Sequence, residues 1–413
     1  MSEFKVVMLT PHGDPLGRIG EPEVGGQCVY IRELSSHLAL SGLKVQVFTR
    51  DRGDGKPSVE PIAPGAELVR LPCGPRTFIP KEALLPYLGE FAERVRAYLQ
   101  GDEVLHSHFW DGGYVAEVLD WRGPWIHTSH SLGKRKLAAM PDADLSQYQD
   151  RIRIETEVGE KCDLITAATN LEKDDLAKLY GVVPSKVVVI PPGVDTSRFR
   201  PPEDKDALRR ELGFPERPLV FTLGRLDERK GFDLFFRAAA HLLRQLGVDP
   251  APLFVISAGV GGSPHEAEQR LKLEELISSL GIEDHVRWLE VLPQEELPLY
   301  YGAADVFVLP SRYELFGIVM LEAMACGVPV VATRFGGPAE VIAHGENGFL
   351  VDPTDTEELA RAIEVLVCDP ELRREMGHRA RRIVEERYSW EVSAQLHKNL
   401  YSRLVSEKGK GER

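Results

Sequence analysis

The chain has 413 residues, of which 43% are hydrophobic and 28% are charged, the balance of an ordinary globular protein. At roughly 100–200 residues per domain, this length predicts at least two domains. The formal net charge of −14 argues against nucleic-acid binding, which needs a basic surface, and against docking on anionic lipid. We therefore expect no nucleic-acid partner and no stable membrane insertion.

The five cysteines are odd in number and include no CxxC pair, so we expect neither a disulfide framework nor a structural zinc site. The chain does not open with a basic segment followed by an apolar one, and no run approaches about 18 apolar residues. We therefore expect no signal peptide, no membrane span and a cytoplasmic location.

Short apolar runs rich in β-branched residues recur along the chain and are predicted to be strands. They lie at 4–9, 45–49, 68–71, 104–107, 125–128, 164–167 and 187–190, and again at 219–223, 253–257, 286–289, 306–309 and 328–332. Helical patterns such as 29–41, 231–246 and 266–280 separate them. Runs that do not alternate with polar residues indicate strands buried on both faces of a parallel sheet. The predicted fold class is α/β, with two Rossmann-like doubly wound domains facing a central cleft.

The joint between the two domains is predicted near Pro191-Pro192-Gly193, since proline continues neither a strand nor a helix. We expect an N-terminal, acceptor-binding domain over 1–192 and a C-terminal, nucleotide-sugar-binding domain over 193–387. The remaining 388–413 is predicted to be a helix that packs back on the N-terminal domain. Ligands of open parallel sheets bind at the carboxyl ends of the strands, so the residues that follow each strand matter most.

A long glycine-rich loop, residues 10–25, follows the first strand, and a helix begins near Gln27. Glycine lets the backbone approach a ligand closely, and a helix N-terminus favours an anion. The loop is neither GxGxxG nor a Walker motif, so a flexible turn is the alternative interpretation.

Charged residues follow two strands of the second half. Arg225 and Lys230 come after 219–223 and could hold a diphosphate. Glu314 lies in the loop after 306–309, and Glu322 lies among apolar neighbours in a helical stretch. A buried carboxylate needs hydrogen-bond donors, which sugar hydroxyls can supply; the alternative is a core glutamate satisfied by the protein.

Together these motifs resemble the retaining GT-B-fold glycosyltransferases that use nucleotide-sugar donors, in the clan of sucrose synthases and sucrose-phosphate synthases. The matching elements fall in family order over nearly the whole chain. They are Gly25-Gly26-Gln27, Thr128-Ser129-His130-Ser131-Leu132-Gly133, Pro191-Pro192-Gly193-Val194-Asp195, Gly224-Arg225, Lys230-Gly231, Glu314 to Glu322, Gly336-Gly337-Pro338-Ala339-Glu340 and Glu346-Asn347-Gly348. The chain departs from the family at Glu23-Val24, where Asp-Thr is common.

The resemblance implies roles for individual donor-side residues. Arg225 and Lys230 would bind the diphosphate, with Gly26 approaching it from the other domain, and Glu322 would hold the ribose. The sugar hydroxyls would meet Glu314 and the backbone of Phe316, Gly317, Ile318 and Val319, and the base would meet the backbone of Leu292. His130 would contact the transferred sugar near the reacting carbon. UDP-glucose is the expected donor and GDP-mannose the alternative.

The mechanism that the resemblance implies is front-face substitution. A double displacement needs a carboxylate nucleophile, and no Asp or Glu stands beside His130 or Gly26 in the sequence. The leaving diphosphate would then take the acceptor proton, and the catalytic residues, His130 and Glu314, would act by positioning and charge stabilisation. The donor is a substrate, and no cofactor is expected.

Basic residues that follow strand ends in an otherwise acidic chain indicate a phosphorylated acceptor; ordinary surface charge is the alternative. The candidate acceptor residues are Gln27, Arg76, Lys81, His108, Lys134, Lys136, Arg151 and Arg153. The sequence motifs around these residues most resemble those of sucrose-phosphate synthases and mannosylfructose-phosphate synthases. This resemblance implies fructose 6-phosphate as the acceptor. The inositol-phosphate-accepting glycosyltransferase of mycothiol synthesis is the alternative.

Three other interpretations are open. His106, His108 and Asp111 could hold a metal, since alternate strand residues point the same way, but hydrogen bonding is favoured and no metal is predicted. A phosphorylase or an epimerase of the same fold is a rival enzyme class. A nucleotide-sugar-binding module without transfer activity is the non-enzymatic alternative. The oligomeric state is not predicted.

Overall fold

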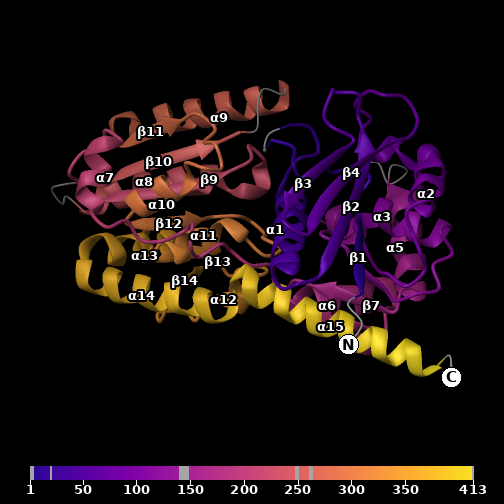
Figure 1. The fold of residues 1–413 in the computed structure, drawn as a ribbon. Helices are drawn as coiled ribbons and strands as arrows, with labels where there is room; N and C mark the ends of the chain where they lie inside the picture. The colour runs from indigo at the N-terminus through magenta and orange to yellow at the C-terminus, as the bar shows by residue number, and fades with distance from the viewer. Residues whose placement is uncertain (1–3, 19–20, 139–147, 247–250, 260–263, 412–413) are drawn as a thin grey trace. The chain divides into compact units, whose positions relative to one another are not determined.

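The computed structural model describes residues 4–18, 21–138, 148–246, 251–259 and 264–411. The chain divides into two compact units (Figure 1). Unit 1 comprises Met1–Pro192 and Trp390–Arg413, and unit 2 comprises Gly193–Ser389. The division falls between Pro192 and Gly193, and the last helix belongs to unit 1 by its contacts although it follows unit 2 in the sequence.

Unit 1 is built on an eight-stranded sheet with the order β3-β4-β2-β1-β5-β6-β7-β8. Its strands are β1 (Lys5–Leu9), β2 (Lys44–Asp51), β3 (Val59–Ala63), β4 (Ala66–Pro72), β5 (Val104–His108), β6 (Trp125–Thr128), β7 (Leu164–Ala167) and β8 (Val187–Val189). All neighbours are parallel except β3 and β4. The carboxyl ends of β1, β5 and β6, which carry the predicted site residues, are therefore neighbours at one edge.

Helices cover both faces of this sheet. They are α1 (Gly26–Leu40), α2 (Leu88–Arg96), α3 (Phe109–Val118), α4 (Gly133–Ala138), α5 (Gln149–Lys161), α6 (Asn170–Tyr180) and α15 (Trp390–Gly411). Val7 and Leu9 of β1 enter a core with α2, α3 and α5, whereas Val6 and Met8 enter a core with α1 and α15. Figure 1 shows α1 on one side of the sheet and α2, α3 and α5 on the other. Burial of both faces explains why the strands read as continuous apolar runs.

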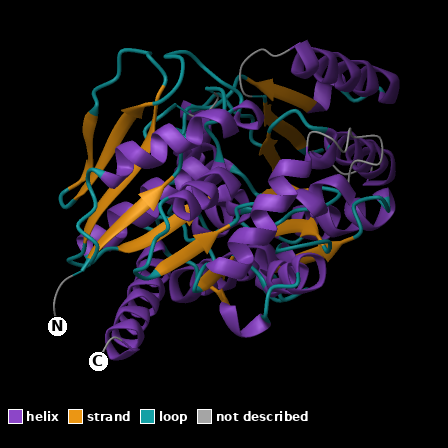
Figure 2. Cartoon of the chain, turned by 90° about the vertical axis from the view of Figure 1, so that its right-hand side faces the viewer, coloured by secondary structure: helices purple, strands orange, loops and turns teal. Residues whose placement is uncertain are grey.

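Unit 2 has a six-stranded parallel sheet with the order β11-β10-β9-β12-β13-β14. Its strands are β9 (Leu219–Gly224), β10 (Leu253–Ala258), β11 (Val286–Leu289), β12 (Val306–Leu309), β13 (Val330–Thr333) and β14 (Gly348–Val351). Its helices are α7 (Lys205–Glu211), α8 (Phe232–Leu246), α9 (Pro264–Leu280), α10 (Leu297–Ala303), α11 (Ile318–Ala325), α12 (Pro338–Val341), α13 (Thr356–Cys368) and α14 (Pro370–Arg387). In Figure 2 purple helices flank the orange strands of each sheet. The predicted α/β class with two Rossmann-like units is confirmed.

Strands β3 and β14 were not predicted from the sequence, and β13 begins two residues later than predicted. β3 is an antiparallel edge strand that carries Pro61, and β14 begins at Gly348. Both residues weaken a strand pattern. Pro329 lies just before β13 and delays its start. Over the part of the chain that the structure describes, no helix combines the length and the apolar character that crossing a membrane requires.

Candidate active site

The predicted donor residues of unit 2 come together at the carboxyl ends of β9 and β12. Lys230 Nζ lies 2.6 Å from Glu314 Oε2, and the Ser311 hydroxyl donates to the same oxygen over 3.1 Å. Lys230 reaches this point because Gly231, with φ +68°, packs against the end of β12, where a Cβ atom would lie 2.0 Å from the Pro310 carbonyl oxygen. The structure thus places Lys230, which is predicted to bind the diphosphate, in contact with Glu314, which is predicted to bind the sugar.

The backbone of Glu314 is fixed by the glycine pair that follows β13. Glu314 N–H donates to the Phe335 carbonyl over 3.1 Å, and Gly337 N–H donates to the Glu314 carbonyl over 2.9 Å. A Cβ atom at Gly336 would lie 1.8 Å from the Glu314 carbonyl oxygen. Gly336 also has φ +111°, a value that residues other than glycine avoid. The Gly-Gly motif is therefore explained by close packing against the Glu314 loop.

Helix α11 begins directly after this loop, with Gly317 as N-cap at φ +90°. The backbone groups predicted to meet the sugar, those of Phe316, Gly317, Ile318 and Val319, fall at this helix start, where N–H groups lack intrahelical acceptors. Glu322 is buried, and the Tyr301 hydroxyl donates to its Oε2 over 2.7 Å. The protein thus supplies a hydrogen-bond donor to Glu322, and the role of Glu322 toward ribose stays a prediction.

Arg225 is exposed in the loop after β9, and Leu292 is half-buried after β11. Between Arg225 and Lys230, Asp227 shapes the loop by accepting hydrogen bonds from the backbone and side chain of Arg229. Burial would raise the pKa of Asp227, but these bonds lower it to about 2. Asp227 is therefore ionised and forms an ion pair with Arg229.

In unit 1, His130 follows β6 and contacts the last residue of β5. His130 Nε2 lies 3.0 Å from Nδ1 of the fully buried His108. The backbone of His130 has φ +56°, a left-handed conformation that non-glycine residues rarely adopt. Burial and the neighbouring histidines lower the pKa of both rings. The structure brings together the predicted catalytic histidine and one predicted acceptor residue, both uncharged.

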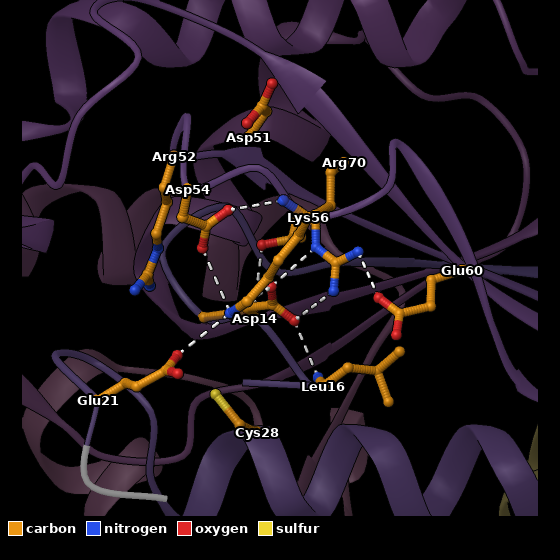
Figure 3. Close-up of polar contacts among 12 residues, drawn as sticks. Asp14, Leu16, Glu21, Cys28, Asp51, Arg52, Asp54, Lys56, Glu60 and Arg70 are labelled. Atoms are coloured by element: carbon orange, nitrogen blue, oxygen red, sulfur yellow. Dashed lines mark hydrogen bonds and ion pairs between the residues drawn. The ribbon is translucent and has the colours of Figure 1, made fainter. Parts of the chain in front are cut away.

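The glycine-rich loop after β1 is anchored by buried ion pairs that were not predicted from the sequence. Arg70 Nε donates to Asp14 Oδ2 over 2.8 Å, and both side chains are almost fully buried. Figure 3 shows the Asp14 carboxylate between Arg70 and Lys56. Earlier in the loop, His12 Nδ1 lies 2.8 Å from the buried Asp111 at the start of α3. These contacts tie the described part of the loop to β4 and to α3.

Glu23 lies at the end of the same loop and contacts Lys81, which is predicted to bind the phosphate of the acceptor. Lys81 Nζ lies 2.7 and 2.9 Å from the two oxygens of Glu23. Burial opposes ionisation of Glu23, but the hydrogen bond and charge of Lys81 lower its pKa. Glu23 has φ +62°. The departure from the family pattern at Glu23 thus lies in direct contact with a candidate acceptor residue.

Arg151 lies next to the His130 loop on the buried face of α5. Its guanidinium donates to the carbonyl and hydroxyl of Ser131 over 2.8 and 3.0 Å and to Glu155 over 2.7 Å. Its charge also lies over the Phe109 ring, 4.6 Å from the centroid. Arg153, two residues further along the helix, is half-exposed and pairs with Glu157. The two arginines therefore lie on different faces of α5 and do not converge as predicted.

Other candidate acceptor residues are dispersed. Arg76 is exposed and pairs with Asp51 over 2.8 Å. Lys134 donates to a backbone carbonyl of α6, and Lys136 lies over the Tyr148 ring. Gln27 donates to Thr10 Oγ1 over 3.3 Å, beside Gly26 at the start of α1. Residues 139–147, which lie between the candidates Lys136 and Arg151, fall outside the described residues.

A metal site does not form from the side chains that the sequence suggested. His106 is hydrogen-bonded to Tyr401 and Thr128, and Asp111 holds His12. Within the described ranges, no group of three or more His, Cys, Asp or Glu side chains is arranged to hold a metal ion.

Comparison with known proteins gives consistent matches over the whole chain. The family described as glycosyl transferases group 1 matches residues 204–383, and glycosyltransferase family 4 matches residues 24–198. A D-inositol 3-phosphate glycosyltransferase from Corynebacterium jeikeium is 36% identical, and the match covers 99% of each chain. A sucrose-phosphate synthase from Thermosynechococcus elongatus has a similar structure, with a TM-score of 0.86, 32% identity and coverage of 98% of this chain and 100% of that chain. HepE from Anabaena, solved with UDP and glucose, shares the fold with a TM-score of 0.74 at 21% identity, covering 97% and 99% of the chains.

Proposed function

The chain belongs to the group 1 glycosyltransferases of the GT-B fold, as its motifs predicted, and from this premise we propose that it transfers a hexose from a nucleotide sugar to a small phosphorylated acceptor. The observation that carries the donor half is the contact between Lys230 and Glu314, since a diphosphate and a hexose are adjacent in a nucleotide sugar. The proposed donor is UDP-glucose.

The proposed acceptor carries a phosphate on a small polyhydroxyl molecule. Lys81 and Arg151 supply cations on the acceptor side, and a phosphate is best bound by charge-assisted hydrogen bonds. Fructose 6-phosphate is one candidate, because the similar solved structure is a sucrose-phosphate synthase. Inositol 3-phosphate is the second candidate, because a full-length relative is a D-inositol 3-phosphate glycosyltransferase.

The proposed reaction retains the configuration of the anomeric carbon by front-face substitution. The bond between the anomeric carbon and the diphosphate oxygen breaks, the acceptor oxygen bonds to that carbon, and its proton passes to the leaving diphosphate. Lys230 and Arg225 stabilise the charge that develops on the diphosphate, and His130 donates a hydrogen bond to the sugar. The nucleotide sugar is a substrate, no cofactor takes part, and the five free thiols fit a reducing cytoplasm.

An acceptor panel tests this proposal. UDP-glucose and GDP-mannose are each incubated with fructose 6-phosphate, inositol 3-phosphate, fructose and inositol, and products are identified by mass. We expect transfer from UDP-glucose to one phosphorylated acceptor, and NMR of the product should show the anomeric configuration of the donor. Equal transfer to phosphorylated and plain acceptors would contradict the acceptor assignment, and an inverted product would contradict the mechanism.

A further inference from the structure

The contact of His108 with His130 leaves one atom of His108 unexplained. His108 Nδ1 lies 3.0 Å from His130 Nε2, and the His108 ring is fully buried. His108 Nε2 is buried too and has no hydrogen-bond partner within the part of the chain that is described. The side chain of His108 therefore makes its hydrogen bond to the histidine expected at the reacting carbon.

This arrangement determines where the two rings carry their protons. Burial lowers the pKa of both rings, so each is neutral and has one N–H. If His108 were protonated on Nε2, a buried N–H would lack an acceptor, which is rarer and costlier in folded proteins than an unused lone pair. The proton of His108 is then on Nδ1, from where it donates to His130 Nε2.

We propose that His108 is a positioning residue that holds His130 in the tautomer protonated on Nδ1, so that Nδ1–H of His130 is the donor to the transferred sugar. The inference rests on the proposed function for the role of that donor. A histidine that accepts on Nε2 has no proton to give from that atom. His130 then acts as a hydrogen-bond donor of fixed direction and not as a general base.

The surroundings of His108 hold its ring in place. The His106 ring lies 4.2 Å away between centroids, and the Tyr30 ring lies edge-on at 6.1 Å. His106 is fixed by the Tyr401 hydroxyl at 2.7 Å. The Tyr30 hydroxyl donates to His397 Nε2 over 3.1 Å, because His397 Nδ1 donates to a backbone carbonyl of its own helix. Tyr30 of α1 thus packs against the His108 ring, residues of α15 hold Tyr30 and His106 in place, and the fold sets the orientation of the ring.

The backbone at His130 also requires an external restraint. Its φ of +56° costs on the order of 1 kcal/mol or more for a non-glycine residue and persists only where the surroundings impose it. The Tyr30 ring, edge-on at 5.0 Å, and the hydrogen bond from His108 are two such restraints. The strain and the hydrogen bond together indicate that the direction of the His130 ring is built into the structure.

Nitrogen-15 NMR of the full-length chain labelled at histidine reads the tautomer without any substrate. His130→Asn assigns the His130 signals. In the wild type we expect His130 Nε2 to show the chemical shift of an unprotonated nitrogen and Nδ1 that of a protonated one. His108→Phe removes the donor, so Nε2 of His130 should become protonated. His108→Asn keeps an N–H near the position of Nδ1 and should restore the wild-type pattern.

Transfer kinetics of the same variants test the positioning role. His108→Phe should lower kcat by up to roughly 100-fold, the scale of a misplaced reacting group, with the KM for donor nearly unchanged. His108→Asn should recover most of the loss. His127→Asn is the matched control, since His127 is equally buried but hydrogen-bonds Ser107 on the neighbouring strand; its kcat should stay within about 3-fold of wild type.

A protonated Nε2 of His130 in the wild type would overturn the proposal, and so would unchanged kcat in His108→Phe. An equal loss in His127→Asn would overturn it as well, because the effect would then be general destabilisation. The NMR measurement decides the tautomer even if every acceptor in the panel fails, so a failure of the proposed function is distinguished from a failure of this inference.

Discussion

The ion pair between Glu23 and Lys81 gives a direct test of how the acceptor is recognised. Both oxygens of Glu23 lie within 2.9 Å of Lys81 Nζ. A phosphate that binds Lys81 must compete with this carboxylate for the same ammonium group. We therefore expect Glu23→Gln to strengthen binding of a phosphorylated acceptor and to leave a plain acceptor unaffected.

The size of the effect follows from the exposure of the pair. At an effective dielectric constant of about 20, unit charges about 4 Å apart attract by roughly 4 kcal/mol before desolvation and side-chain ordering are subtracted. The side chains of Lys81 and Glu23 are 21% and 18% exposed, so a net value on the order of 1 kcal/mol is expected. Because 1.4 kcal/mol corresponds to tenfold, the KM for phosphorylated acceptor should fall by about 5-fold.

The assay is steady-state transfer at saturating donor with fructose 6-phosphate, inositol 3-phosphate and their unphosphorylated counterparts. Lys81→Ala should raise the KM for the phosphorylated acceptor only. Glu82→Gln is the matched control, because Glu82 lies 3.4 Å from Lys81 but is 53% exposed; its KM should change by less than about 2-fold. A raised KM in Glu23→Gln would refute the reasoning, since Glu23 would then orient Lys81 for the phosphate instead of competing with it.

Three further predictions concern the donor, the loop anchor and pH. Arg225→Ala and Lys230→Ala should each weaken UDP binding by about 1.5–3 kcal/mol in calorimetry; unchanged affinity in both would exclude the diphosphate role. Asp14→Asn should lower the free energy of unfolding in urea by about 1.5–3 kcal/mol, the scale of a hydrogen bond to a charged group, because the buried Arg70 loses one carboxylate partner and keeps Glu60; a loss below about 1 kcal/mol would contradict this. Burial raises the pKa of Glu172 from 4.5 to about 7, so the folded state retains its proton longer and stability falls as pH rises from 4.5 to 7; urea unfolding of Glu172→Gln should lack this contribution.

Much of the fold follows from the sequence because buried parallel strands leave a strong signal. The predicted runs at 125–128, 164–167, 286–289 and 306–309 coincide with β6, β7, β11 and β12. β6, β7 and β12 are fully buried, as expected of parallel strands covered on both faces, whereas the edge strand β11 is only partly buried. β3 and β14 were missed because Pro61 and Gly348 interrupt the pattern at the edges of the sheets.

The sequence indicated which residues to consider for the candidate site, but it did not indicate which of them contact one another. The tendency of ligands to bind at strand ends selected Lys230 and Glu314 from the sequence, and the family resemblance selected His130. The contact of Tyr401 with His106 joins residues 295 positions apart, and no local pattern indicates it. Arg153 was grouped with Arg151 because of charge alone, whereas helical geometry places the two on different faces.

On the acceptor side, several non-glycine residues adopt the left-handed backbone that such residues usually avoid, and this strain itself indicates a site. Four non-glycine residues among those described have a left-handed backbone, and three of them, Glu23, Phe109 and His130, adjoin the predicted acceptor residues. The φ of +63° at Phe109 lies directly after β5 and accompanies a ring placed beside His12 and under the charge of Arg151. Each such residue costs roughly 1–3 kcal/mol and needs neighbours that enforce it. The concentration of backbone strain beside Lys81, Arg151 and His108 is therefore a second reason to place substrate recognition there, and this reason does not depend on their charges.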